Sequence, residues 1–529
     1  MRTLFTLGFA FVIANVITMP LVGQQAPNQP IEFPEFIVTG KERVDVPGGT
    51  KNMPARPPVL RKAQLDSLNA VEKAAPPVIP PAMLPIPTRP TVAHPGYVSA
   101  ELGQYTTPDV QAGYSMVVGG YRLDAAAGIE ASNGHLTNAA YHKAHASVLS
   151  TFVAPEQYVV FGGSTTETDI GISSRAYRFF GDSAAAERTV FALRAAVDVE
   201  GEYQGFTYRA TAGYRRTGIT TDVREIADAV IHGHVDVEQR WRAYDVGGSV
   251  SVNLRSFGGV SYPFIEGKGR ARYVGESVRL LLDAGLQAAT STGDVGRAGF
   301  LLAGRADVNF GPDLTAIGTL RSGLRAVVFS DLLTVNPYVS DSLLLDAVYD
   351  VVDLGGTVLW HPTTRLSGSV GVRVRITDRD AVWTPSSAGA FGVSYLSTTT
   401  IEIPVELRWL VSPSDVVRTN LNIVSSSIAN AAVTPYVPSA QAAAWYDRSW
   451  TQDLRTALGL IYVGQRYADI DNRRVLSGYI DLRLRAEYDI AERFTLTARV
   501  NNLLGADILL WDGYRERGIF VSAGCTWRL

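Results

Sequence analysis

The chain has 529 residues, of which 46% are hydrophobic and 19% are charged, and its formal net charge is −3. This apolar content excludes disorder throughout the chain, and the absence of a basic excess argues against nucleic acid as a partner. The single cysteine excludes a disulfide framework and any CxxC metal site. Arginine outnumbers lysine 42 to six, which either suits ion-paired polar walls or reflects a GC-rich genome.

The N-terminus has the pattern of an export signal. Arg2 is followed by an apolar run from Leu4 to Val22 and then by the small residue Gly23. This pattern predicts a signal peptide over residues 1–23 whose cleavage leaves the mature chain outside the cytoplasm. A single membrane anchor is the alternative. After residue 23 no stretch suits a membrane helix, so the mature chain is either soluble and exported or spans a membrane as a closed β-barrel.

A proline-rich segment divides the chain. Residues 41–95 hold 12 of the 27 prolines. Because proline lacks an N–H donor and fixes φ, this segment cannot build a sheet or a long helix. We expect a disordered, extended N-terminal arm, with at most a few helical turns over Arg61 to Lys73. The segment separates residues 24–40 from residues 96–529 and is too small to be an independent domain.

Residues 96–529 alternate between apolar and polar side chains. Residues 206–215, 369–377, 401–409 and 479–488 show this period of two most clearly. A strand with this pattern has one apolar and one polar face, and segments of about ten residues with aromatic ends are typical of membrane β-barrels. A soluble β-sandwich is the alternative, but the many Ala and Gly residues suit its core poorly. We therefore predict an all-β, antiparallel, outer-membrane β-barrel of 22 strands, within a range of 16 to 22.

The polar faces of these strands supply the candidate functional residues. In a membrane barrel they point into the lumen, where charges shape the selectivity for solutes. Structural ion pairing across the wall is the alternative role. The lumen-facing candidates are Arg373, Arg375, Glu402, Glu406, Arg408, Asp481, Arg483, Arg485 and Glu487.

The C-terminal residues form another alternating segment. We expect this last strand to pair with the strand near residue 97, which closes the barrel and leaves no free edge. It is also the strand that we expect the barrel-assembly machinery to engage. One face, which we expect to contact outer-membrane lipid, carries Val521, Ala523, Cys525, Trp527 and Leu529.

Three stretches resemble one family, the TonB-dependent outer-membrane receptors. Residues 96–134, with a turn at Gly119-Gly120, resemble the first barrel strands, and residues 498–529 look like the last two. This resemblance implies a barrel in the outer membrane of a Gram-negative bacterium, an unknown small solute, and TonB or another periplasmic protein as partner. The TonB-box-like stretch, which is also explained as an apolar patch in the tail, is Glu35, Phe36, Ile37, Val38 and Thr39, followed by Gly40.

The chain departs from the family at the plug. In the family a folded plug domain lies between the TonB box and the barrel, whereas residues 41–95 are too short and too rich in proline, so they are a linker or a vestigial plug. The resemblance implies solute transport. The alternative function is a structural or assembly barrel that docks periplasmic partners through residues 31–95. Because an empty barrel would leak, we expect the arm or a separate protein to fill it.

Enzyme chemistry is not indicated. No nucleophile-elbow motif is present, no Ser/His/Asp set can be assembled, and no cofactor or metal is implied. His232 and His234 fall in a predicted outer loop, residues 218–234, where a solvated pair is the simpler explanation than a metal site. Further outer loops are predicted at residues 132–140, 171–186, 378–388, 426–438 and 464–475.

Overall fold

The computed structural model describes residues 94–158, 162–222, 224–428 and 432–529. The predicted signal peptide, the TonB-box-like stretch and residues 41–93 of the proline-rich segment lie outside this range. Within it, no helix is both long enough and apolar enough to cross a membrane.

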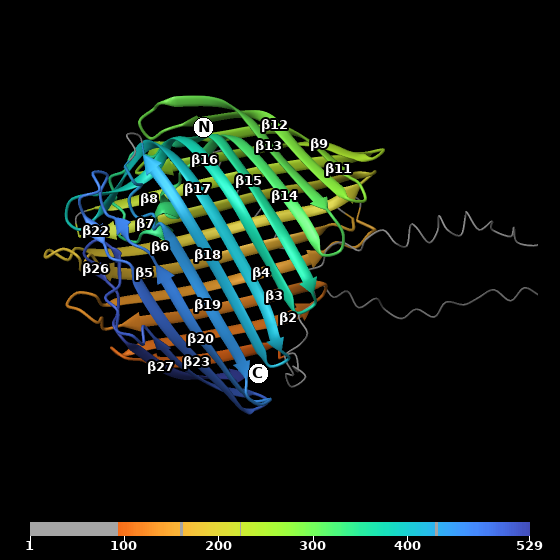
Figure 1. The fold of residues 1–529 in the computed structure, drawn as a ribbon. Helices are drawn as coiled ribbons and strands as arrows, with labels where there is room; N and C mark the ends of the chain where they lie inside the picture. Colours follow the sequence, from red (N-terminus) through yellow and green to blue (C-terminus); the bar gives the residue numbers. More distant parts are fainter. Residues whose placement is uncertain (1–93, 159–161, 223, 429–431) are drawn as a thin grey trace, which may run out of the picture. The chain divides into compact units, whose positions relative to one another are not determined.

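The described residues form one large antiparallel sheet, whose tilted strands lie side by side in Figure 1. The sheet holds 23 strands, and one of them, β10, pairs only with β9. The other 22 strands form the ring, which confirms the predicted strand number. The ring strands are β1 Gly96–Gly103, β2 Thr107–Val118, β3 Tyr121–Ser132, β4 Tyr141–Val153, β5 Thr165–Arg178, β6 Glu187–Tyr203, β7 Phe206–Thr221, β8 Glu225–Trp241, β9 Tyr244–Phe257, β11 Phe264–Val274, β12 Val278–Thr290, β13 Gly296–Asn309, β14 Leu314–Ala326, β15 Ala347–Thr363, β16 Leu366–Pro385, β17 Phe391–Ser412, β18 Asp415–Ile428, β19 Ala440–Ser449, β20 Leu454–Val463, β23 Tyr479–Ala491, β24 Phe494–Asn501 and β27 Phe520–Arg528.

The remaining elements are short and lie in connections between ring strands. The one helix in the described part of the chain, α3, follows β14. The short elements are β10 Val260–Ser261, α3 Phe329–Val335, β21 Arg466–Tyr467, β22 Val475–Leu476, β25 Leu509–Trp511 and β26 Tyr514–Arg515.

The ring closes between the first and last strands. β1 pairs with β27 from Tyr97 opposite Arg528 to Gly103 opposite Ser522. The N–H of Leu529 donates to the carbonyl of Gly96 at 2.8 Å, so pairing continues to the end of the seam. No strand edge is left open there, and the predicted closure is confirmed.

Each strand has one apolar and one polar face. On β23, Ile480, Leu484 and Tyr488 are exposed, whereas Asp481 on the opposite face is buried. The same division is present on β12, where Leu280, Leu282 and Leu286 are exposed and Asp283 and Gln287 are buried. Exposed apolar side chains that alternate with polar ones around a closed ring are the pattern of a barrel surrounded by lipid.

The two ends of the barrel differ. The turn end holds the start of β1, the end of β27 and tight connections such as Gly119-Gly120, where both residues have positive φ. The opposite end, here called the loop end, holds the longer connections, including residues 327–346, 464–478 and 502–519. Successive connections lie at alternate ends because consecutive strands are antiparallel. Most connections at the turn end hold two to four residues, but the one over residues 154–164 is longer, and the connection over residues 104–106 at the loop end is short.

Three of the predicted loops are wrong in extent. β5 continues to Arg178, β16 continues to Pro385, and β7 and β8 occupy most of residues 218–234. His232 and His234 therefore lie in strand β8 and not in a loop. These strands run beyond the roughly ten residues that cross a membrane. At the loop end the inner faces of β7 and β8 carry buried apolar side chains, such as Ile219 and Ile226, so the alternation of polar and apolar residues is lost there.

Pro404 lies within β17. In the ladder between β16 and β17, Val370 pairs with Val405 and Arg373 pairs with Glu402. The two positions between these pairs, one of which is Pro404, are unpaired in this ladder. Proline has no N–H to donate to a ladder, so this interruption is the local consequence. The pairing of Pro404 with Asn422 on the other side of the strand is kept.

The same substitution should have different effects on stability on the two faces of a strand. Arginine at Leu282, near the middle of the apolar face of β12, should destabilise the barrel by about 2–4 kcal/mol, because the charge is placed in lipid. The neighbouring Leu281 lies on the opposite face, so Leu281→Arg should cost much less. Urea unfolding in lipid vesicles measures both. Equal losses would contradict the assignment of the faces.

Candidate functional site

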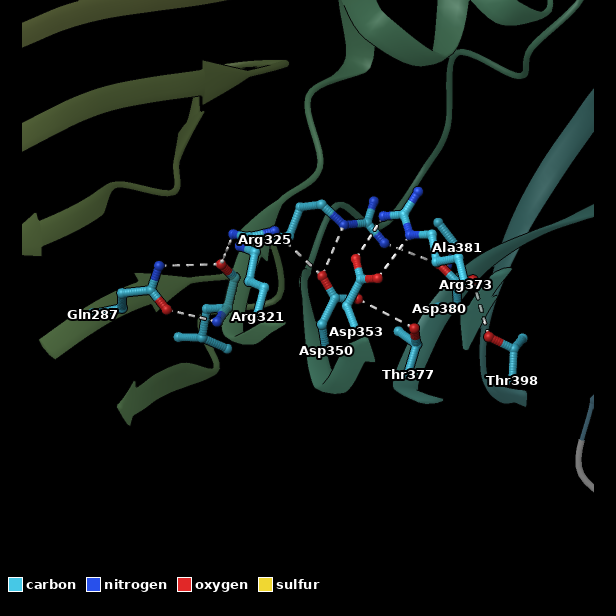
Figure 2. A network of polar contacts seen from close by, with 11 residues as sticks. Gln287, Arg321, Arg325, Asp350, Asp353, Arg373, Thr377, Asp380, Ala381 and Thr398 are labelled. Carbon is cyan, nitrogen blue, oxygen red and sulfur yellow. Dashed lines mark hydrogen bonds and ion pairs between the residues drawn. The ribbon is translucent and has the colours of Figure 1, made fainter. Parts of the chain in front are cut away.

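The polar face carries networks of ion pairs between neighbouring strands, one of which is shown in Figure 2. Asp350 of β15 is 1% exposed, and its carboxylate lies 3.4 Å from both Arg321 and Arg325 of β14. Thr377 of β16 donates a third hydrogen bond to it at 3.1 Å. Arg325 also pairs with Asp380 at 3.3 Å. The buried carboxylate is thus surrounded by donors from both neighbouring strands.

A second network lies on strands β8, β11 and β12. The guanidinium of Arg270 pairs with Asp283 at 2.8 Å, with Asp236 at 3.2 Å and with Glu238 at 3.0 Å. Lys268 pairs with Asp283 at 3.1 Å. Charges of both signs therefore alternate along this wall, and arginine accounts for most of the positive partners.

Five of the nine charged residues predicted to face the lumen are ion-paired. Arg373 donates to Asp353 at 2.7 Å. Asp481 is buried, accepts from Arg483 at 2.7 Å, and also accepts from the backbone N–H of Asn502 at 2.8 Å. Arg485 and Glu487 form a pair with each other.

The other four lie on the same face without an ion pair in the described structure. Arg375 of β16 is opposite Asp353 and Thr400 in the neighbouring strands, and its Nε has no hydrogen-bond partner among the described residues. Glu402 is opposite Arg373. The remaining two are Glu406, opposite Asn420, and Arg408, opposite Arg418.

His232 and His234 lie on the polar face of β8. Their rings stack with centroids 6.4 Å apart, and His232 shares a hydrogen bond with Asn253 at 2.8 Å. Across the described residues, no group of three or more His, Cys, Asp or Glu side chains is arranged to hold a metal ion.

The turn end contains a cavity of about 750 Å³ beside the seam. Its lining includes Asp124, Arg455, Asp489 and Arg528. His94, the first described residue, also lines it, so the chain enters the barrel next to this cavity. The TonB-box-like stretch that precedes it in sequence lies outside the described residues.

The loop end contains a feature that the sequence analysis missed, the connection over residues 327–346. Its side chains Phe329, Leu333, Val339 and Leu345 are almost completely buried. They pack in one cluster with side chains of β6, β7, β8, β9 and β15 and with partly buried side chains of β5, β16 and β17. A single segment can reach strands from such different parts of a closed ring only across its interior.

An aromatic cluster adjoins this segment. Tyr338 stacks on Tyr514 of the 502–519 connection, with ring centroids 3.5 Å apart, and Tyr514 also contacts Phe180. Trp511 packs against Phe391. Burial raises the pKa of both Tyr338 and Tyr514, so both phenols stay neutral at physiological pH. The aromatic side chains come from connections on several sides of the loop end.

Asp346 ends the connection just before β15 and is buried. It pairs with Arg297 at 2.9 Å and with Arg379 at 2.7 Å. Burial by itself would raise the pKa of this carboxyl, but these partners and the N–H of Ala347 outweigh it, and the pKa is lowered. Asp346 is therefore a charged anchor for the C-terminal end of the segment.

Comparisons with known proteins agree on the fold. No family model matches the sequence, and no curated protein sequence matches it. Among solved structures, the copper transporter OprC is similar over 82% of this chain and 80% of its own, with a TM-score of 0.65 and 12% identity.

Two further structures give similar values. The ferric-catecholate import receptor Fiu from Escherichia coli K12 has a TM-score of 0.63 and 10% identity over 83% of this chain and 82% of its own. The FrpB iron transporter from Neisseria meningitidis has a TM-score of 0.66 and 7% identity over 82% of this chain and 81% of its own. The fold is thus the barrel of TonB-dependent receptors, as the sequence resemblance predicted. At these identities the likeness establishes the fold alone.

Removing Asp350 should destabilise the barrel. Asp350→Ala leaves Arg321 and Arg325 without their shared buried acceptor, so we expect a loss of about 1–3 kcal/mol in urea unfolding. Asp307→Ala is the matched control, because its partner Arg305 is half exposed. That change should cost less than about 0.5 kcal/mol. Equal losses in the free energy of unfolding would show that the burial of the Asp350 ion pairs does not contribute to stability.

The lowered pKa of Asp346 predicts that the stability of residues 327–346 depends on pH. Because its pKa is lowered in the folded state, its stabilisation is present above the unfolded pKa of about 4 and is lost as the pH falls through the folded value. Asp346→Asn should therefore speed hydrogen exchange of residues 327–346 at pH 7, relative to the parent protein at the same pH. The difference should shrink below about pH 4. Asp341→Asn is the control in the same segment. The Asp341 carboxylate accepts a hydrogen bond from the adjacent Ser342 and forms no ion pair among the described residues, so this change should leave exchange unaltered.

Proposed function

We propose that this protein is an outer-membrane receptor that moves a solute across the membrane, with energy supplied by TonB or another periplasmic protein. The observation that carries the proposal is the closed 22-strand ring with an apolar outer face and a charged inner face. Solved proteins of similar fold are described as an import receptor and as metal transporters. Substrate identity is not part of the proposal.

In this proposal the turn end faces the periplasm. Membrane barrels have short periplasmic turns and longer outer loops, and all but one of the connections at the end where β1 begins hold two to four residues. The arm that precedes His94 then starts on the periplasmic side, where a partner can reach it. Phe36, Ile37 and Val38 are strong β-formers that suit addition of a strand to a partner's sheet edge.

The ion-paired inner face supports a polar route for the solute. Arg375 and Arg408 lie on this face without a carboxylate within ion-pair distance in the described structure. We propose that these two arginines, with Glu402 and Glu406, influence which solutes pass, whereas the paired residues stabilise the wall. Charged rings and patches along a pore are a general source of selectivity.

The coupling stretch can be tested in cells of the protein's own host. Ile37→Pro removes a backbone N–H and should prevent strand addition. A photo-crosslinker at Val38 should capture TonB from cells with the parent sequence and not from Ile37→Pro cells. Ile37→Val is the control and should behave as the parent.

Transport is measured by mass spectrometry of the medium. Cells with the parent protein should deplete at least one solute that cells lacking residues 35–40 leave unchanged. If a partner is captured but no solute differs between the strains, the protein is a docking barrel and the transport proposal fails.

A further inference from the structure

We propose that residues 327–346 are an internal gate that closes the loop end, and that Arg188 and Arg255 form a latch which an anionic oxygen group opens. The gate consists of the connection between β14 and β15, including helix α3. The latch consists of two arginines on the inner faces of β6 and β9. The inference concerns the barrel alone and does not depend on the N-terminal arm.

The position of the gate follows from the order of the ring. One buried cluster joins the gate to β5 through β9 and to β15 through β17. Four ring strands lie between these two groups on one side, and ten lie between them on the other. The stack of Tyr338 on Tyr514 extends the contact to the connection between β24 and β27. The gate is therefore packed across the interior, against opposite parts of the wall.

The latch arginines are buried but bind only neutral acceptors. Arg188 is 2% exposed and donates to the carbonyl oxygens of Val339 at 2.6 Å and of Pro337 at 3.3 Å. Arg255 is 3% exposed and donates to the carbonyl of Val327 at 3.3 Å. Arg188 therefore binds the middle of the gate, at Pro337 and Val339, and Arg255 binds its first residue, Val327.

No carboxylate pairs with either arginine within the described residues. Their guanidinium groups lie over aromatic rings, Arg188 at 4.6 Å from the centre of Phe179 and Arg255 at 4.5 Å from that of Tyr262. The Nε atoms of both are buried and have no hydrogen-bond partner among the described residues. Asp228, whose charge acts on Arg255, accepts hydrogen bonds from the N–H of Ser330 and from the hydroxyl of Tyr262.

An anion can therefore compete with the carbonyl oxygens of the gate for the latch arginines. A buried arginine without a counter-ion is costly, and a hydrogen bond to an anion is about twice as strong as one to a neutral carbonyl. The planar guanidinium also matches carboxylate and phosphate groups in shape. When the gate fluctuates outward, a carboxylate or phosphate group can bind Arg188 in place of the carbonyls of Pro337 and Val339. The gate then loses the anchor that Arg188 provides and is held at its middle by the hydrogen bond from Tyr177 to the Pro337 carbonyl, so it opens more often.

The wall contacts of the gate define a cross-link that tests it. Val339 forms a parallel β-bridge with Phe391, and the N–H of Ser340 donates to the carbonyl of Phe391 at 2.7 Å. Bridged residues have Cα atoms within the range that a disulfide spans. The double variant Val339→Cys/Phe391→Cys, made together with Cys525→Ser, should therefore lock the gate when oxidised and free it when reduced.

The experiment is single-channel recording in planar bilayers, with chloride as the baseline anion and inorganic phosphate or acetate as added probes. The full mature chain should be mostly closed in chloride, and either probe should raise its open probability. A response to phosphate alone would assign the latch to phosphate groups, and a response to acetate alone to carboxylates. Arg188→Gln should raise open probability in chloride at least about tenfold and should no longer respond to the probes.

Arg194→Gln is the matched control. Arg194 lies on the same face of β6, pairs with Asp169 at 3.1 Å and does not contact the gate. It should leave open probability and the anion response unchanged. All variants are also recorded without residues 24–93, so that an arm lying in the barrel cannot conceal opening of the gate.

Two results would overturn the inference. If the oxidised and reduced cross-linked proteins conduct equally, the gate does not control the pore. If the reduced protein conducts more but neither phosphate nor acetate opens the parent protein, the segment is a gate without an anion latch. Because the disulfide is formed in folded protein, failure of Arg188→Gln to fold does not affect either conclusion.

Discussion

The structure depends on one constraint, the need of every backbone N–H and C=O group inside a membrane for a partner within the protein. An open sheet cannot meet it, because its two edges expose a full row of unpaired groups to lipid. The pairing of β27 with β1 removes both edges at once. The residues of this seam lie more than 400 positions apart in sequence, so the ring forms only when the whole barrel chain is present.

Closure of the ring also decides the chemistry of the interior. The inner face is confined, so its charges are partly removed from water and need partners close by. Arginine meets this need because its fork reaches carboxylates on two neighbouring strands, as Arg325 does with Asp350 and Asp380. The wall networks are thus a requirement of the fold. Candidates for a role in selectivity have to be sought among the inner charges that are left unpaired.

The alternation of side chains was enough to predict the barrel, its faces and its closure, because lipid and lumen impose a strict period of two. The period of two also assigned Arg373 and Asp481 to the polar face. It could not predict their ion-pair partners, because the sequence of one strand does not determine its register against the next strand. It also failed at His232 and His234, because buried apolar side chains on the inner face of β8, Ile226 and Val230, interrupt the alternation before them. The alternation does not predict the 327–346 segment, because Phe329, Leu332 and Leu333 are apolar at the spacing of a helix and not at the period of two of a strand.

The stack of Tyr338 on Tyr514 has a consequence for the order of assembly. Tyr338 belongs to the middle of the chain, whereas Tyr514 belongs to the connection that leads into the final strand. The stack can form only after residues 502–519, which lead into that strand, have reached the loop end. A barrel that lacks this last connection therefore lacks the contact, so the packing of residues 327–346 at the loop end is completed only late in assembly.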